Sequence, residues 1–293
     1  MMKVAADAPV LRLGELVERD GIFHRPGQEE TAYKRQWEAE ASHDHVASAI
    51  ARGSAGVDDY ETLTGKIAPL WNRFPEGRHI ETVLEIGCGY GRIPLYLGRE
   101  HNLTWKTYCA VDISETMLRR LLEYRARFAL VPSGRLYPVC VSADALPLED
   151  NSVDLVLTSA VFLHMGKSFV ERTVAEVARV LKPGGAFVFD VSFPNARNPS
   201  SYLPRMKPKR LRSPNFLKYW TRDEVQRLIR ESGLEAKSGS AVIEPTSFAL
   251  LPKRVGAVGV PLSRRINAAL GKPERFRDVL AVSYSAFSET LFR

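Results

Sequence analysis

The stretch that decides the fold reads Val83-Leu84-Glu85-Ile86-Gly87-Cys88-Gly89-Tyr90-Gly91-Arg92. A short, mostly apolar run, typical of a buried strand, passes directly into three closely spaced glycines, which allow a tight turn and a close approach of backbone to ligand. Arg92 stands where a dinucleotide-binding loop carries its third glycine, so the pattern disfavours NAD and FAD. Glu85 suits a positively charged ligand better than a pyrophosphate.

Outward from this loop, short apolar strands alternate with amphipathic helices, a pattern that predicts a parallel sheet covered on both faces. The expected strands are 82–86, 107–111, 136–141, 153–158, 186–191, 235–243 and 279–287. The expected helices are 31–51, 57–74, 92–99 and 117–128, and two more that open at Ser168 and Thr221, each followed three residues later by a capping-box glutamate. The fold class is therefore α/β, a doubly wound, mostly parallel seven-stranded sheet.

Two aspartates follow neighbouring strands of this predicted sheet. Asp112 ends the second strand, about twenty residues past the glycine loop, where a carboxylate can accept both hydroxyls of a ribose. Asp144 follows the third strand, from where it can reach an exocyclic amine of adenine. Because ligands of open α/β sheets bind at the carboxyl ends of the strands, we expect both carboxylates at one crevice.

With these motifs, residues 57–243 resemble the class I S-adenosylmethionine-dependent methyltransferases, in the broad subgroup that includes ubiquinone and menaquinone biosynthesis enzymes. The resemblance rests on four motifs in family order, which are Glu85–Arg92, 111–113, 143–145 with 154–158, and 181–185, the last being a helix stop and turn. It implies an enzyme that uses S-adenosyl-L-methionine and releases S-adenosyl-L-homocysteine.

The resemblance also implies roles for individual residues. Glu85 and the loop glycines hold the methionine part, Asp112 binds the ribose, and Asp144 takes the adenine amine. The full cofactor-binding set is Glu85, Gly87, Cys88, Gly89, Gly91, Asp112, Ile113, Met117, Asp144, Ala145 and Thr158, with Ile113 and Met117 against the adenine and Thr158 near the sulfonium. No metal site is expected; His43 and His45 are two apart on a predicted helix and do not share a face.

His164 is the candidate catalytic residue. It lies just past the fourth expected strand, where related enzymes often carry a histidine, and its ordinary pKa near neutrality suits it to accept a proton as a general base. A hydroxyl acceptor needs such a base, so oxygen is slightly favoured over nitrogen. The alternative is that His164 only packs or hydrogen-bonds in its loop.

The predicted organisation is a tail and helical lid over residues 1–56, with 1–30 only partly ordered, and a methyltransferase domain over 57–293. An insert at about 194–220, basic and rich in aromatics, is expected to cap the acceptor side of the crevice or to form a solvated loop. A second insert at 248–277 is basic and partly amphipathic, and is expected to act as a lid or to rest on a membrane surface.

The bulk composition of the 293 residues fits a soluble cytoplasmic enzyme, with 45% hydrophobic and 26% charged residues and no apolar run after the amino terminus that would act as a secretory signal. The three cysteines have no metal-binding spacing. The favoured acceptor is a small molecule, lipid or glycolipid. The net charge of +7 and the basic stretch 202–220 keep an RNA methyltransferase open as the alternative, and a non-catalytic binding protein is the third.

Overall fold

The computed structural model describes residues 10–28, 31–41, 80–91, 93, 105–128, 134–159, 161–194, 220–236, 241–243 and 284–292. Several sequence-based predictions therefore lie outside the described residues. These are helix 57–74, nearly all of helix 92–99, His43 and His45, and almost all of the inserts 194–220 and 248–277.

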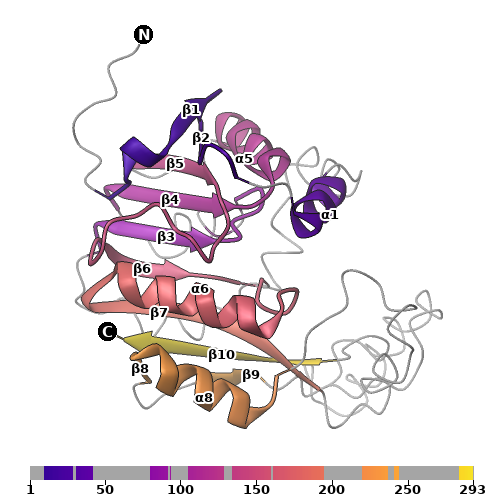
Figure 1. Ribbon diagram of the computed structural model, residues 1–293, viewed down its shortest axis with the longest axis vertical. Helices are drawn as coiled ribbons and strands as arrows, with labels where there is room; N and C mark the ends of the chain where they lie inside the picture. The colour runs from indigo at the N-terminus through magenta and orange to yellow at the C-terminus, as the bar shows by residue number, and fades with distance from the viewer. Residues whose placement is uncertain are drawn as a thin grey trace, which may run out of the picture.

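One twisted sheet runs through the molecule, as Figure 1 shows. Its order is β1-β2-β5-β4-β3-β6-β7-β10-β8, with β9 also paired to β10. The five central strands are parallel, and β10 runs antiparallel to β7. The central strands are β3 (Thr82–Ile86), β4 (Thr107–Asp112), β5 (Arg135–Cys140), β6 (Val153–Leu157) and β7 (Leu181–Pro194), and the others at this end are β8 (Glu235–Ala236), β9 (Ala241–Ile243) and β10 (Tyr284–Phe292). The predicted doubly wound, mostly parallel seven-stranded sheet is confirmed from β5 to the position that β8 and β9 share beside β10. The strands β1 (Val17–Arg19) and β2 (Ile22–His24) extend it beyond β5.

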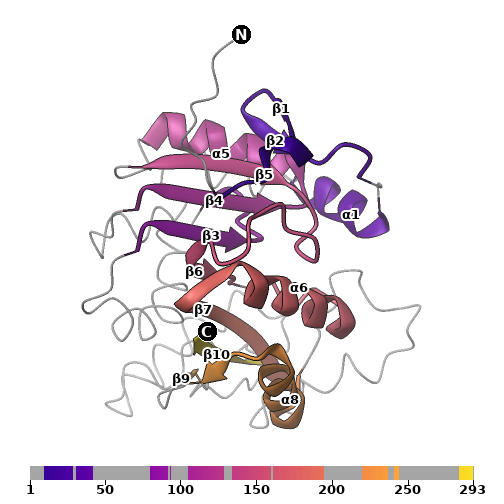
Figure 2. The ribbon, with the colours of Figure 1, turned by 60° about the vertical axis from the view of Figure 1, so that its left-hand side comes forward.

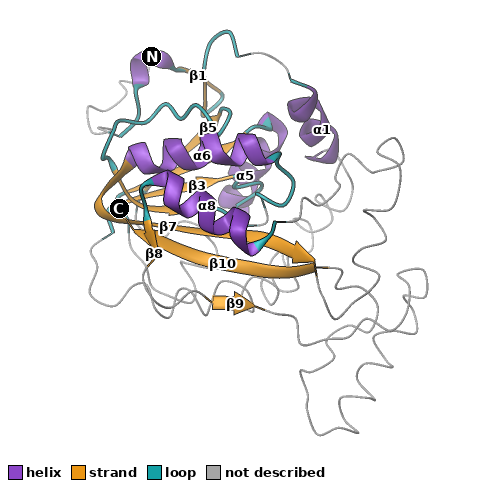
Figure 3. Cartoon of the chain, turned by 60° about the horizontal axis from the view of Figure 1, so that its bottom comes forward, coloured by secondary structure: helices purple, strands orange, loops and turns teal. Residues whose placement is uncertain are grey.

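Helices cover both faces of this sheet. The amphipathic helices α6 (Lys167–Val180) and α8 (Arg222–Ser232) lie side by side on one face (Figure 3). Alternate residues of β3 show why two layers form: Leu84 and Ile86 pack in the core under α6 and α8, whereas Val83 packs with α5 (Glu115–Phe128). All five residues of β3 are buried, which explains its mostly apolar sequence.

The helix ends agree with the sequence in one case and not in the other. The capping box of α8 is present, with the Thr221 side chain accepting from the Glu224 amide, and Gly233 ends the helix in the left-handed conformation. The capping box predicted at Ser168 is wrong. Helix α6 begins one residue earlier, with Gly166 as its N-cap and no side-chain cap.

Residues before position 30 depart most from expectation. Where only a partly ordered tail was predicted, β1 (Val17–Arg19) and β2 (Ile22–His24) form a hairpin, and β2 adds a parallel strand to the edge of β5. The apolar pairs Val10-Leu11 and Ile22-Phe23 are buried, but each is too short to show a period. The strand predicted at 279–287 is β10, and it begins and ends five residues later than predicted.

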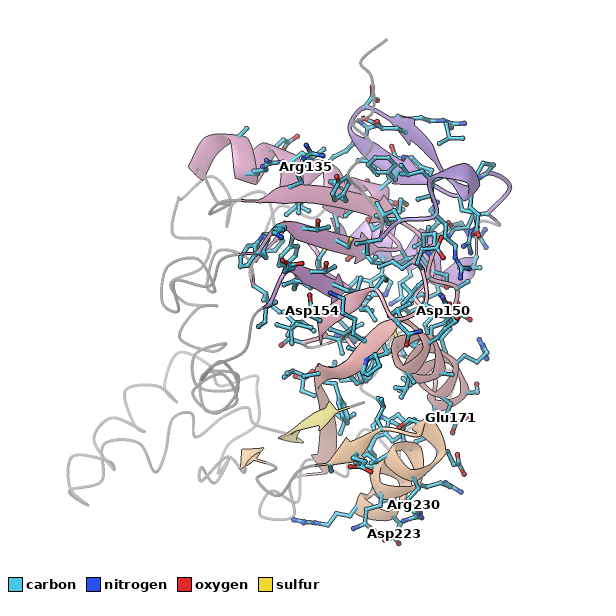
Figure 4. All side chains as sticks on the ribbon, turned by 90° about the vertical axis from the view of Figure 1, so that its left-hand side faces the viewer. Arg135, Asp150, Asp154, Glu171, Asp223 and Arg230 are labelled. Atoms are coloured by element: carbon cyan, nitrogen blue, oxygen red, sulfur yellow. The ribbon has the colours of Figure 1, made fainter. Side chains whose placement is uncertain are left out.

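The turn expected at 181–185 belongs partly to β7. Leu181 pairs with Val153 and Ala186 with Leu155, so the residues between them form an irregularity at the start of the strand. Asp154, at the same amino edge of the sheet as Arg135 (Figure 4), ties this edge together by accepting from the amides of Glu81 and Thr82 at 3.0 and 2.9 Å. Lys182 donates to its other oxygen at 2.8 Å. Asp154 therefore stabilises the amino edge of the sheet and lies away from the carboxyl ends of the strands.

Candidate functional site

A cavity lies at the carboxyl ends of β3, β4 and β5, beneath helix α1 (Ala32–Ala41), which sits beyond these strand ends in Figures 1 and 2. The site residues predicted from the sequence that line it are Gly87, Gly89, Asp112, Ile113, Met117 and His164. The other lining residues are Tyr33, Trp37, Ile86, Tyr90, Val111, Val141, Ala143, Ser159, Val161, Met165 and Phe169.

Asp112 is the carboxylate of this cavity. It ends β4, is 8% exposed, and accepts hydrogen bonds from the amide of Gly89 at 2.8 Å and from the amide of Ser114 at 2.9 Å. Burial is the largest cause that raises the pKa of Asp112 to about 6, against the lowering effect of these amides, and the charge of Glu38 raises it further. A buried carboxylate with a perturbed pKa in a cleft is typical of a ligand-binding group.

Two amides of the glycine loop after β3 donate hydrogen bonds to the end of β4. The amides of Gly87 and Cys88 both donate to the Val111 carbonyl, at 2.8 and 3.1 Å, which holds the loop beside Asp112. Gly91 has a φ of +88°, and a Cβ there would lie 2.2 Å from the Leu121 side chain of α5. A Cβ on Gly89, by contrast, would meet no atom within 4 Å, so open space lies beside the loop backbone.

Several predicted cofactor residues do not line the cavity. Glu85 is buried and accepts from the hydroxyl of Tyr108 at 2.7 Å. The Cys88 thiol packs in the core on the α5 face, where burial raises its pKa well above the usual range. Gly91 packs against α5, and Thr158 is buried at the end of β6. Cofactor roles for these four remain predictions, through backbone or indirect contact.

The Asp144 side chain is engaged elsewhere. Its carboxylate pairs with Arg172 of α6 at 2.9 Å and accepts from the Ser142 hydroxyl, and neither Asp144 nor Ala145 lines the cavity. Of the three carboxylates expected to bind the cofactor, Glu85, Asp112 and Asp144, only Asp112 lines the cavity in this structure. The reason is a side chain of another element, Arg172, which draws Asp144 toward α6.

The residues present fit S-adenosylmethionine. Ile113, Met117, Val141 and Ala143 form an apolar wall that an adenine would fit, Asp112 is a carboxylate that ribose hydroxyls would need, and the space beside Gly89 would admit the chain that follows the ribose. These roles of the individual residues stay predictions. Among the described residues, no group of three or more His, Cys, Asp or Glu side chains is placed to hold a metal ion.

His164 faces the cavity from the loop between β6 and α6. Its ring lies 5.2 Å from that of Trp37, centroid to centroid, and Trp37 reaches it from the lid helix α1. Tyr33, one turn earlier on α1, also lines the cavity, and burial raises its pKa to about 12, so its hydroxyl stays protonated. Helix α1 thus contributes two residues to the lining of the cavity, and its role as a lid stays a prediction.

Sequence reasoning missed Glu38, which attaches α1 to the cavity wall. Its carboxylate accepts from the amides of Glu115 and Thr116, at 2.6 and 3.2 Å, and from the Ser114 hydroxyl at 3.1 Å. A carboxylate at the amino end of α5 satisfies amides that lack a helical partner and interacts favourably with the helix dipole. No local signal shows this contact, because Glu38 and Glu115 are 77 residues apart.

Replacing Glu38 with alanine should loosen the lid. We expect the free energy of unfolding to fall by about 1–2 kcal/mol, as for loss of a helix cap, and S-adenosylhomocysteine to dissociate about tenfold faster. Urea unfolding and stopped-flow release measure the two effects. Glu123→Ala removes the same charge from an exposed position on α5 and serves as the control. Equal behaviour of the two variants would show that the Glu38 contacts do not hold the lid.

Fold and site together define a class of protein, an α/β nucleoside-binding protein with its ligand site at the carboxyl ends of the first strands. Residues 84–189 match the methyltransferase domain family. A methyltransferase from Haloferax volcanii, solved in complex with its Trm112 activator, shares the fold with a TM-score of 0.52 at 20% identity, over 84% of this chain and 96% of that one.

Curated relatives point the same way. The chain is 26% identical to phosphoethanolamine N-methyltransferase of Triticum aestivum over 68% of this chain and 37% of that protein. It is 29% identical to malonyl-[acyl-carrier protein] O-methyltransferase of Alcanivorax borkumensis over 53% of each. It is 25% identical to the tRNA N(3)-cytidine methyltransferase METTL2 of Bos taurus over 60% of this chain and 48% of that protein. The matches thus span about half or less of these relatives.

Residues 84–189 therefore carry a methyltransferase domain of the class I S-adenosylmethionine-dependent type. The cofactor that this domain implies is S-adenosylmethionine, with S-adenosylhomocysteine as its product. In the part of the chain that the structure describes, no helix has both the length and the apolar character needed to cross a bilayer.

Proposed function

We propose that this chain transfers the methyl group of S-adenosylmethionine to a small-molecule acceptor, a lipid or glycolipid included, that enters the cavity beneath α1. The observation that carries the proposal is the joint position of Asp112 and His164. One cavity holds a carboxylate suited to a ribose and an imidazole suited to take a proton.

The residues of the chain have separate tasks in this reaction. When bound, the cofactor supplies a methyl group on a positively charged sulfur, an already good leaving group. Asp112 accepts hydrogen bonds from the ribose hydroxyls, and the apolar wall orients the adenine. The lid residues Tyr33 and Trp37 exclude water, and His164 holds the proton that the acceptor loses. Alignment of this kind contributes several kcal/mol to lowering the barrier.

The element of the acceptor atom is not decided by His164. The preference for oxygen rested on the need for a base, but a protonated amine must also lose a proton before it can attack. The matched relatives act on nitrogen as well as oxygen by their names. We therefore propose a methyl acceptor with a removable proton and do not carry the preference for oxygen further.

The RNA alternative depends on the basic stretch 202–220, which lies outside the described residues except for its last residue, Trp220. A tRNA methyltransferase is among the matched relatives, so this alternative has a distinct test. Binding of RNA with a steep decrease as salt rises would favour it, because each phosphate contact releases counterions. Transfer of the methyl group to a small molecule from the extract, at a rate that does not depend on salt, would favour the main proposal.

The experiment that tests the proposed function has two parts. Calorimetry should detect binding of S-adenosylmethionine and S-adenosylhomocysteine to the full chain. A labelled-methyl transfer assay on fractionated extract of the source cells should then show which fraction takes up label. Cofactor binding without transfer to any fraction would favour the non-catalytic alternative, and absence of cofactor binding would refute the proposal altogether.

The affinity for cofactor should depend on pH through Asp112. Its pKa of about 6 in the ligand-free protein means that the carboxylate is mostly ionised at pH 7 and mostly protonated at pH 5. Because ribose hydroxyls need an ionised acceptor, we expect the dissociation constant for S-adenosylhomocysteine to rise about tenfold from pH 7 to pH 5. Calorimetry across this range measures it, and a flat profile would contradict the role of Asp112.

A further inference from the structure

Four rings that line the cavity form what we call the aromatic corner, namely Tyr33 and Trp37 of α1, His164 of the loop before α6, and Phe169 of α6. The Tyr33 and Trp37 rings meet at 74° with centroids 6.2 Å apart, and Trp37 and His164 meet at 71° and 5.2 Å. Tyr33 and Phe169 are 6.3 Å apart at 41°. None of these three contacts is a parallel stack.

The inclination of these rings favours a compact ligand over a flat one. A planar acceptor is held best between two nearly parallel faces, whereas rings that meet steeply present several faces and edges to a single small group. The electron-rich faces of tryptophan and tyrosine attract cations, above all methylated ones whose charge is spread over a weakly hydrated surface. The geometry of the corner therefore suits a methylated ammonium or sulfonium centre.

The charge of the cavity agrees with this reading. Asp112 is the only Asp, Glu, Lys or Arg side chain among the described residues that line it. Glu38, at the amino end of α5, acts on Asp112 as a second negative charge. The guanidinium of Arg172, 5.5 Å from the Phe169 ring, is paired with Asp144. In the described lining, a ligand cation thus meets negative charge and aromatic rings, with no lysine or arginine side chain.

We propose that the aromatic corner binds an onium cation, either the methylated ammonium of an amine acceptor or the sulfonium of the cofactor. This inference rests on the proposed function for the place of the reacting atoms. In transfer to a neutral amine, the nitrogen lone pair forms the new bond to the methyl carbon, and the carbon–sulfur bond breaks with its electron pair going to sulfur. The positive charge moves from sulfur to nitrogen, so the corner faces one cation before and after transfer. A primary or secondary amine then loses its proton to His164.

The test compares two probes of nearly equal shape and different charge. Choline and its neutral carbon analogue 3,3-dimethylbutan-1-ol are titrated into the full chain that has been saturated with S-adenosylhomocysteine. We expect choline to bind at least about tenfold more tightly than the neutral analogue. Trp37→Leu should abolish this preference, and Trp37→Phe, which keeps a ring, should restore most of it.

A second measurement separates the two sources of the cation. If the corner holds the sulfonium, Trp37→Leu should weaken S-adenosylmethionine about tenfold and leave S-adenosylhomocysteine, whose sulfur is neutral, nearly unchanged. If it holds the acceptor, both cofactor affinities stay nearly unchanged and only the choline preference is lost. Equal binding of the two probes, together with equal effects of Trp37→Leu on both cofactor forms, would overturn the inference. Failure of S-adenosylhomocysteine to bind at all would instead refute the proposed function.

Discussion

Replacing Asp112 with alanine should weaken the binding of both S-adenosylmethionine and S-adenosylhomocysteine about 100-fold or more, since hydrogen bonds to a buried carboxylate are among the strong ones. Asp112 is the carboxylate at the cavity, and its partners Gly89 and Ser114 keep it in place for a ribose. Isothermal titration calorimetry measures both affinities directly.

The matched control is Asp144→Ala. The Asp144 carboxylate pairs with Arg172 outside the cavity lining, so we expect its loss to change cofactor affinity less than about tenfold, in line with a partly exposed ion pair. Comparable losses for the two variants would show that Asp144 turns toward the adenine when cofactor binds. Unchanged affinity of Asp112→Ala would refute the ribose assignment.

Unfolding of the Asp112→Ala variant is not expected to explain its loss of affinity. Folding raises the pKa of Asp112 from 3.8 to about 6, so this group favours the folded state at low pH, and that contribution is lost as pH rises through about 6. At pH 7 the buried charge costs on the order of 3 kcal/mol. Alanine removes this cost but leaves two amides without their acceptor, which costs a similar amount. Urea unfolding of the ligand-free variant should therefore stay within about 2 kcal/mol of the parent.

Replacing His164 with phenylalanine should reduce turnover about 100- to 10,000-fold while leaving the affinity for S-adenosylhomocysteine within about threefold. Phenylalanine keeps a ring against Trp37 but cannot accept a proton, so the variant removes the base and retains the packing. The labelled-methyl assay gives turnover, and calorimetry gives affinity.

His164→Ala, which removes both base and ring, provides the comparison. If His164 acts as a base, the two variants should lose turnover to a similar extent, and the acidic limb of the pH–rate profile should change in both. If His164→Phe retains near-normal turnover and only His164→Ala loses it, the residue serves as packing for the aromatic corner and not as a base.

The central strands could be predicted because each carries its own signal. β3, β4 and β6 are short, mostly apolar runs, and Thr221 with Glu224 and Gly233 marks both ends of α8. The hairpin of β1 and β2 could not be predicted, because a three-residue strand has no measurable period. Its place is decided by the free edge of β5, to which Phe23 and His24 pair.

The candidate site divides in the same way. Asp112, Ile113 and the loop glycines could be found because a strand end and a glycine turn fix where their backbone lies. Asp144 also follows its strand as expected, but the sequence does not show that Arg172, 28 residues further on, captures its side chain. Glu38 carries no local pattern at all, and the sequence that singles out His164 does not show that Tyr33, Trp37 and Phe169 gather at the same cavity.

By itself the sequence determined the alternation of strands and helices, the glycine loop and the carboxylate that follows the second strand of the central sheet, because hydrophobic period and turn chemistry are properties of neighbouring residues. Only the tertiary structure decided which carboxylate faces the cavity, how α1 is attached above it and which rings meet there. Those features depend on side chains of distant segments that come together when the sheet is assembled. A local sequence pattern does not show in which direction such a side chain turns.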